Sequence, residues 1–193
     1  SEMCIRDSYT RDINYLRDTA YPLMKGACDF MLEWLIEDPH NPAQLITAPC
    51  TSPEADYITD KGYRGSSLYG GTADLAIIRE LFKNTIKGAQ ALGIDKNYQV
   101  RLQSSLERLR PYHIGKRGNL MEWYHDWDDQ DWHHRHQSHL LGLYPFHQIS
   151  LAQTPDLAQA ATKTLEIKGD KSTGWSTGWR INLWAVSYTH LRA

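Results

Sequence analysis

The sequence lacks two features that would assign it at once to a large class of proteins. It has no apolar run close to the roughly 20 residues that a membrane-spanning helix needs. It also has no basic surplus, because 21 lysines and arginines stand against 23 aspartates and glutamates, for a formal net charge of −2. A surface that binds nucleic acid favours a basic excess. We therefore expect neither a membrane partner nor a nucleic-acid partner.

Cysteine is scarce as well, with only three in 193 residues and wide spacing between them. Such spacing favours neither a disulfide framework nor a cysteine metal knuckle. Convincing alternation of apolar and polar residues is missing too, so we expect no β-strands, and no internal repeat is found. With 41% hydrophobic residues, the chain is long enough for one domain with a sizeable core.

The two ends differ from the rest of the chain. Residues 3–7 can be encoded as ATG TGT ATA AGA GAC, and the reverse complement of that string encodes residues 186–190. This antiparallel match is typical of a transposase end sequence used in library preparation. We expect residues 1–8 and 186–193 to be translated adapter, and residues 9–185 to be an internal piece of a longer protein. A leader peptide would then lie outside the sequence, and the compartment is unknown from it.

Apolar residues at helical spacing predict helices over residues 12–36 (with a break at Pro22), 72–92, 97–109, 136–143, 154–167 and 175–185. Residues 44–71 and 112–132 have no sustained period, and stretches of that length in a compact domain are usually functional or disordered. The aromatic and hydrophobic residues of 44–71 favour an ordered, functional loop. The predicted fold class is therefore all-α, with helical hairpins separated by long loops. Such an order is typical of part of an α/α toroid whose loops gather at one end.

Residues 118–145 concentrate the reactive side chains. They hold five of the nine histidines, three of the seven tryptophans and five carboxylates. Acids, imidazoles and flat aromatic faces together suit a site for a hydroxyl-rich ligand. Trp123, Trp127 and Trp132 lie outside the periodic segments and are candidates for it, although core filling is the alternative.

The histidines of this segment could also hold a metal, because His136 and His139 would share a helix face, with Asp131 and His133 close by. The spacing does not match H-E-x-x-H, and Arg135 would place a fixed cation beside a dication. We therefore predict no metal and no cofactor. For His133 a structural role is the more favoured interpretation, as it is for His134.

The tetrapeptide Thr51-Ser52-Pro53-Glu54 in the first long loop has two interpretations. Glu54 could be a general acid, which protonates a leaving oxygen when burial raises its pKa. Alternatively, Ser52 could cap a short helix with Pro53 in its first turn.

Five motifs occur in a fixed order: T-S-P-E, G-x-T-x-D-x-x-I-I-R-E-L-F (with one extra glycine), G-x-L-x-E-W-x-x-D, H-R-H-x-S-H-L-x-G-L-Y-P and G-W-S-x-x-W-x-I-N-L-W-A. Together they resemble glycoside hydrolase family 95, the α-L-fucosidases, some of which act on α-L-galactosides. The resemblance implies a partial (α/α)6 toroid, inversion without a metal, a fucosylated oligosaccharide or glycan as substrate, and a periplasmic or extracellular location. It assigns Glu54 as general acid, with Arg135 and His136 contacting the sugar.

Further residues complete the predicted site. His139 and Trp123 are additional substrate-binding candidates, and Glu122 and Asp126 are expected to orient them. The resemblance places the general base in a Q-I-D-G-N-F-G segment that this sequence does not contain, so we expect the fragment alone to be inactive. Ala55 and Ala73 depart from the family pattern, which leaves the preferred sugar open. A non-catalytic carbohydrate-binding helical module is the alternative function.

Overall fold

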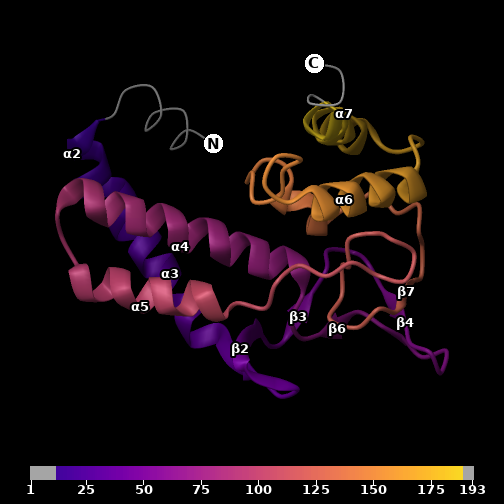
Figure 1. Ribbon diagram of the computed structural model, residues 1–193, viewed down its shortest axis with the longest axis horizontal. Helices are drawn as coiled ribbons and strands as arrows, with labels where there is room; N and C mark the ends of the chain where they lie inside the picture. Colours follow the sequence, from indigo (N-terminus) through magenta and orange to yellow (C-terminus); the bar gives the residue numbers. More distant parts are fainter. Residues whose placement is uncertain (1–11, 189–193) are drawn as a thin grey trace. The chain divides into compact units, whose positions relative to one another are not determined.

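The computed structural model describes residues 12–188, and Figure 1 traces them by colour along the chain. They divide into two compact units. The first comprises the chain up to Leu45 together with Ile78–Leu109, and the second comprises Ile46–Ile77 and the chain from Arg110 onward. Residues 1–8 and 189–193, which we predict to be translated adapter, lie outside the described residues. Residues 186–188 belong to the last helix.

The first unit opens with a long helical segment. α2 (Ile13–Tyr15) begins at Asp12, whose Oδ1 accepts hydrogen bonds from the amides of Asn14 and Tyr15 at 3.1 and 3.0 Å. It continues through a π-helical turn, η1 (Leu16–Ala20), into α3 (Tyr21–Trp34). Pro22 lacks the N–H that an α-helical bond would use, and the wider turn lies directly before it. The predicted break at Pro22 is therefore a change of pitch within continuous helix.

Two further helices form a hairpin with a short link. α4 (Thr72–Leu92) has the predicted bounds, and α5 (Lys96–Arg108) begins and ends one residue early. Gly93 follows α4 with φ +70°, the left-handed conformation that commonly ends a helix. Side chains tie both helices to α3: the Sγ of Cys28 lies 3.1 Å from Thr85 Oγ1, and the Tyr98 hydroxyl donates to Asp29 at 2.6 Å.

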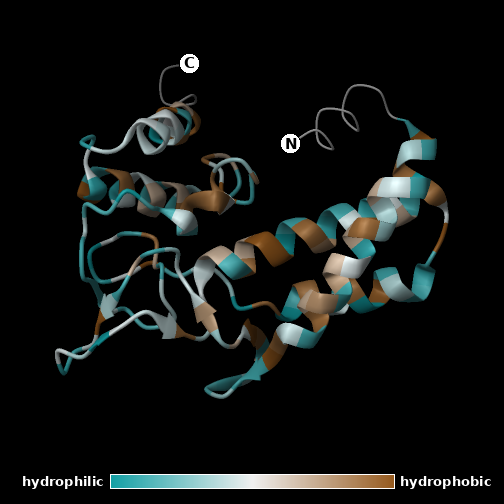
Figure 2. Ribbon diagram, turned by 180° about the vertical axis from the view of Figure 1, so that it is seen from behind, coloured by the Kyte–Doolittle hydropathy of each residue, from teal (hydrophilic) through white to brown (hydrophobic). Residues whose placement is uncertain are grey.

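Part of the apolar face predicted for α3 lies on the surface of this unit. Leu23 is 63% exposed and Phe30 is 61% exposed, and Val100 of α5 reaches 69%. Figure 2 shows such hydrophobic segments on the helices of this unit. The residues that α3 does bury include Tyr21 and Cys28. The sequence thus predicted the helix α3 correctly, but it did not predict which of its side chains are buried in this unit.

The chain is largely helical, as predicted, but the expectation of no β-strands is wrong, because the loops contain small sheets. β1 (Leu35–Asp38) pairs with β2 (Asn41–Thr47), and β3 (Cys50–Thr51) pairs antiparallel with β6 (Ser67–Leu68). β4 (Tyr57–Ile58) lies between β5 (Arg64–Gly65) and β7 (Asp128–Asp129). Five of these strands have only two residues, too few to show an alternating pattern. Their ladders order both long loops, and β7 joins the second loop to the first.

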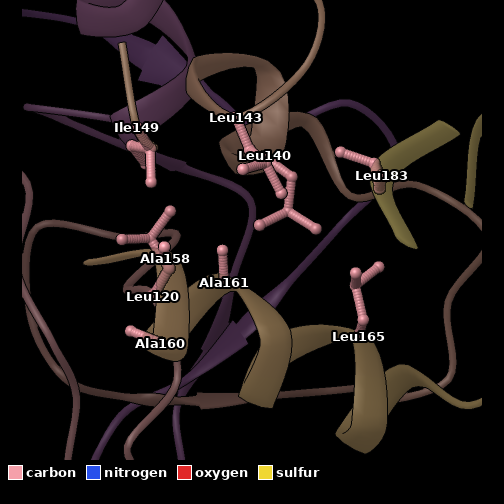
Figure 3. Packing of buried hydrophobic residues seen from close by; sticks show 9 residues of the cluster. All are labelled: Leu120, Leu140, Leu143, Ile149, Ala158, Ala160, Ala161, Leu165 and Leu183. Atoms are coloured by element: carbon pink, nitrogen blue, oxygen red, sulfur yellow. The ribbon is translucent and has the colours of Figure 1, made fainter. Parts of the chain in front are cut away.

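The second unit has its own core around α6 (Pro155–Lys168) and α7 (Gly174–Tyr188). Between the second loop and α6, the predicted short helix is a 3₁₀ turn, η2 (Ser138–Gly142). Figure 3 shows how Leu120, η2 and α7 converge on the alanine-rich face of α6. The amide of Leu120 donates to Ala160 O at 3.1 Å, an approach that small side chains permit. The buried cluster comprises Leu120, Leu140, Leu143, Ile149, Ala158, Ala160, Ala161, Leu165 and Leu183.

Within residues 12–188, no helix combines the length and the apolar character that crossing a bilayer requires.

Candidate functional site

Glu54 lies on the loop between β3 and β4, in the second unit. The amide of Ala55 donates to Ser52 O at 3.1 Å, which closes a tight turn. Glu54 has φ +54°, a left-handed conformation that non-glycine residues seldom adopt and that costs about 1–3 kcal/mol. Its side chain is 58% exposed. The helix-start alternative for residues 51–54 is wrong, because the segment is a strained turn that presents a carboxylate to solvent.

Arg135 and His136 converge on that carboxylate from 81 residues further along the chain. The Arg135 guanidinium bonds Glu54 Oε2, and His136 Nε2 lies 3.4 Å from the same oxygen. Arg135 is 40% exposed at its side chain and His136 is 21% exposed. The structure thus brings the three most strongly predicted residues together, at a place that solvent reaches.

The loop that carries Arg135 and His136 is held from behind by α7. Arg180 is buried, and its guanidinium donates to Gln137 Oε1 at 3.1 Å and to the carbonyl oxygens of Gly169 and His134. A planar guanidinium with five N–H donors suits several carbonyls at once. Burial lowers the pKa of Arg180, although nearby Asp170 counteracts this. The hydrogen bonds of this guanidinium fix the loop that carries Arg135 and His136.

A buried acid supports the Glu54 turn from below. Glu122 is 7% exposed; its Oε1 accepts a short hydrogen bond from the Ser52 hydroxyl, and its Oε2 lies 3.2 Å from His139 Nδ1. Burial alone would raise the pKa of Glu122. The charge and hydrogen bond of His139, together with Lys168 and the Ser52 hydroxyl, hold that pKa below its ordinary range. A carboxylate that stays ionised inside the unit anchors the residue two positions before Glu54.

A second buried pair lies close to the first. Lys168 Nζ is 3.7 Å from Asp129 Oδ2, and the two side chains are 3% and 11% exposed. Burial, with the charge of Glu122, raises the pKa of Asp129 to about 6, although Lys168 opposes this. Both residues line a cleft of about 230 Å³ together with Glu54 and His134. The cleft therefore joins the exposed turn to the buried charges.

The remaining predicted site residues lie deeper or to one side. Trp123 is 2% exposed and packs edge-on against Tyr57, with ring centroids 5.1 Å apart. His139 is 1% exposed. Asp126 accepts a 2.6 Å hydrogen bond from the amide of Lys116, so it fixes a turn. In this arrangement Glu122 does contact His139, whereas Trp123 and His139 present almost no surface to a ligand.

Several residues that hold the site were missed from the sequence, namely Ser52, Lys168 and Arg180. Ser52 was considered only as a helix cap. Lys168 and Arg180 belong to helices or their ends, where charged side chains usually face water. A signal was nevertheless available for Arg180, because it lies three and four residues before Leu183 and Trp184, on the predicted apolar face of its helix.

The histidines of residues 118–145 do not converge on a common point. His133 Nδ1 lies 3.2 Å from the carbonyl oxygen of Lys168, and the rings of His134 and His136 stack with centroids 5.1 Å apart. Across the part of the chain that the structure describes, no group of three or more histidine, cysteine, aspartate or glutamate side chains is placed to hold a metal ion. The imidazoles of this segment instead contact backbone groups and carboxylates, and those of His134 and His136 stack.

An exposed carboxylate beside arginine and histidine N–H donors offers both acceptors and donors to sugar hydroxyls, as the sites of glycoside hydrolases do. Comparison with known families identifies one such class. The family model described as the glycosyl hydrolase family 95 catalytic domain matches residues 3–193. The chain therefore belongs to glycosyl hydrolase family 95.

Individual relatives agree with this assignment. The chain is 38% identical over 179 residues to "Alpha-L-fucosidase 2" of Arabidopsis thaliana, across 92% of the chain and 21% of the relative. It is 34% identical over 191 residues to "Probable alpha-fucosidase A" of Aspergillus niger, across 92% of the chain and 23% of that relative. The chain thus spans about a fifth of the length of these relatives.

Proposed function

We propose that this chain is part of the catalytic domain of an inverting glycoside hydrolase that removes terminal α-L-fucose, or the related α-L-galactose, from oligosaccharides or glycans. Glu54 acts as general acid, and Arg135 and His136 hold the terminal sugar. The observation that carries the proposal is the convergence of both donors on Glu54 Oε2. The names of the relatives from Arabidopsis thaliana and Aspergillus niger support fucose as the sugar.

The chemistry follows from what each group can donate. Glu54 delivers a proton to the glycosidic oxygen as the bond from that oxygen to the anomeric carbon breaks, so the leaving sugar departs as a neutral alcohol. A water molecule attacks the anomeric carbon from the opposite face, and a second carboxylate takes its proton. In inverting enzymes that carboxylate lies roughly 6.5–9.5 Å from the acid. We propose that it comes from a segment outside this sequence, and that the chain alone does not turn over substrate.

His139 and Glu122 have a different role in this proposal. Because His139 is enclosed and lies 3.2 Å from Glu122, it positions the Ser52–Glu54 turn through that carboxylate. Arg135 and His136, by contrast, have N–H groups that sugar hydroxyls can take over from Glu54 when substrate enters. Sugar binding is thereby assigned to the exposed residues and support to the buried ones.

The architecture proposed for the whole domain is an (α/α)6 toroid, of which this chain supplies part. The hairpin of α4 and α5, with α3 beside it, suits that architecture. The exposure of Leu23, Phe30 and Val100 supports it further, because apolar helix faces of this kind normally pack against other helices.

Replacing the acid tests the proposal. In the full-length protein that contains this chain, Glu54→Gln keeps the shape of the side chain and removes the proton. We expect turnover of an alkyl α-L-fucoside to fall about 10²- to 10⁴-fold, the usual contribution of general acid catalysis. Turnover of α-L-fucosyl fluoride, whose leaving group needs little protonation, should change far less. Glu166→Gln, at a carboxylate 51% exposed on α6, is the control, and equal loss on both substrates would contradict the assignment.

The alternative, a non-catalytic carbohydrate-binding module, makes a different prediction. Calorimetric titration of L-fucose into the full-length protein, beside the activity assay, separates the two functions. Binding without any turnover would favour the module. Turnover that depends on Glu54 would favour the enzyme.

A further inference from the structure

Trp175 has a position that the proposed roles do not explain. It lies in the first turn of α7, and it is 52% exposed. Its ring contacts the His136 imidazole edge-on, with centroids 5.1 Å apart and planes at 72°. His136 Nε2 in turn lies 3.4 Å from Glu54. The His136 imidazole therefore lies between the exposed indole of Trp175 and the carboxylate of Glu54.

Exposure alone would mean little, because single apolar residues are common on protein surfaces. The other tryptophans of α7 provide the contrast. Trp179 donates from Nε1 to Tyr144 O at 3.2 Å, and both Trp179 and Trp184 pack against the buried cluster of the second unit. Core filling accounts for those two residues, whereas half of the surface of Trp175 faces solvent beside a polar site.

The first turn of α7 is also fixed to the site. The Ser176 hydroxyl donates to Arg135 O at 2.7 Å, so the residue after Trp175 is bonded to the residue before His136. Ser176 is buried, which protects this bond from competing water. A rigid aromatic surface loses little conformational entropy when a flat ligand packs on it.

We infer that Trp175 is a stacking platform for the sugar that leaves, the ring next to the fucose across the bond that Glu54 protonates. The inference rests on the proposed function. Its basis is an increase in exposure from buried His139 through partly buried His136 to exposed Trp175. An enzyme that removes terminal sugars takes the terminal ring in first, so the more exposed position receives the next ring.

The chemistry of the ligand fits an indole. One face of a pyranose ring carries several C–H groups, and aromatic faces pack well against such surfaces. Stacking of nucleic-acid bases on aromatic side chains is worth about five- to 150-fold in affinity per base when measured by alanine substitution, and we expect a sugar ring to fall within that range. Trp175 would thus contribute to selection of the leaving sugar, and the fucose itself would be recognised by Arg135 and His136.

Two substrates separate this role from a general one. In the full-length protein, Trp175→Ala should lower kcat/KM for a fucosylated oligosaccharide about tenfold to a hundredfold, mainly through KM. It should leave α-L-fucosyl fluoride, which has no leaving sugar, within about twofold of wild type. Trp175→Phe keeps a flat ring and should recover most of the loss. Tyr63→Ala, at an aromatic residue 67% exposed near β5, is the control and should change neither substrate.

Other outcomes would overturn the inference. Equal loss on both substrates would mean that Trp175 serves the fucose site or the fold, and unchanged kinetics on both would mean that it binds no sugar. Thermal unfolding of each variant identifies a folding defect, in which case Trp175→Phe decides between the roles. If Glu54→Gln abolishes turnover of the alkyl fucoside while Trp175→Ala changes nothing, this inference fails and the proposed function stands.

Discussion

Glu122 offers the sharpest test of how the site is supported. Replacement by alanine removes a carboxylate that the Ser52 hydroxyl bonds and that lies 3.2 Å from His139. It also removes a negative charge that interacts with buried Lys168, whose ion pair with Asp129 Oδ2 at 3.7 Å remains. The buried His139 imidazole and the Ser52 hydroxyl would lose their carboxylate partner in a space that water hardly enters. Such groups keep their desolvation cost and lose the compensation for it.

The size of the effect follows from that loss. Removing one partner of a buried charged pair costs about 3–5 kcal/mol, out of the roughly 5–15 kcal/mol that stabilise a typical domain. Glutamine at the same position keeps the volume and can still accept from Ser52, so Glu122→Gln should cost about half as much as Glu122→Ala. The control is Glu166→Gln, because the pair of Glu166 with Lys163 is exposed and worth only about 0.2–0.5 kcal/mol.

Urea unfolding of the 193-residue chain, followed by far-ultraviolet circular dichroism, measures all three variants. With a slope of about 2 kcal/mol per molar urea, Glu122→Ala should lower the midpoint by about 2 M, and Glu166→Gln should leave it nearly unchanged. A double-mutant cycle with Ser52→Ala then isolates the coupling of these two side chains. The reasoning would be refuted if the alanine variant matched the control, since the loss of Glu122 would then leave no buried partner without compensation.

Substitutions at two other charged residues, Asp74 and Arg180, should also change the stability of the chain. Burial raises the pKa of Asp74 from 3.8 to about 6, although a hydrogen bond from Thr47 opposes this. The folded chain therefore binds the proton more tightly than the unfolded chain does. The free energy of unfolding should fall by up to about 3 kcal/mol as the pH rises from about 4 to about 6. Asp74→Asn should remove that fall, so its urea midpoint relative to wild type should be higher at pH 8 than at pH 4, and a constant difference would argue against the effect. Arg180→Leu should cost about 1–3 kcal/mol for the buried Gln137 Oε1 that it leaves without this donor, and less for each of the part-buried carbonyls of His134 and Gly169. Thermal unfolding checks this loss, and a change as small as that of an exposed arginine would contradict it.

The helices were predictable because their apolar residues repeat with the helical period. α4 has the predicted bounds, and α5 and α6 differ by one residue at each end. Periodicity gives no information about which apolar face the described chain covers, as the exposure of Leu23 and Phe30 shows. That depends on which helices pack alongside, a property of the assembled domain.

The strands could not be predicted for a different reason. A two-residue strand such as β4 or β7 has no period, and its existence depends on a partner far along the chain. Tyr57 pairs with Gly65 and with Asp129, and nothing near Tyr57 in sequence indicates the second pairing. The same holds for Ser52 and Glu122, which are 70 residues apart. Local pattern therefore located the two site-bearing loops, while only the structure shows how they are joined.

The contacts between the two loops explain why so many reactive residues lie within residues 118–145. That segment carries Arg135 and His136, which reach Glu54 directly, and it carries Glu122, which holds the turn before Glu54. A strained left-handed residue persists only where its surroundings fix it. In the sequence, the aromatic and charged side chains of residues 118–145 resemble a complete active site. In the structure, many of them instead hold in place a carboxylate that another loop provides.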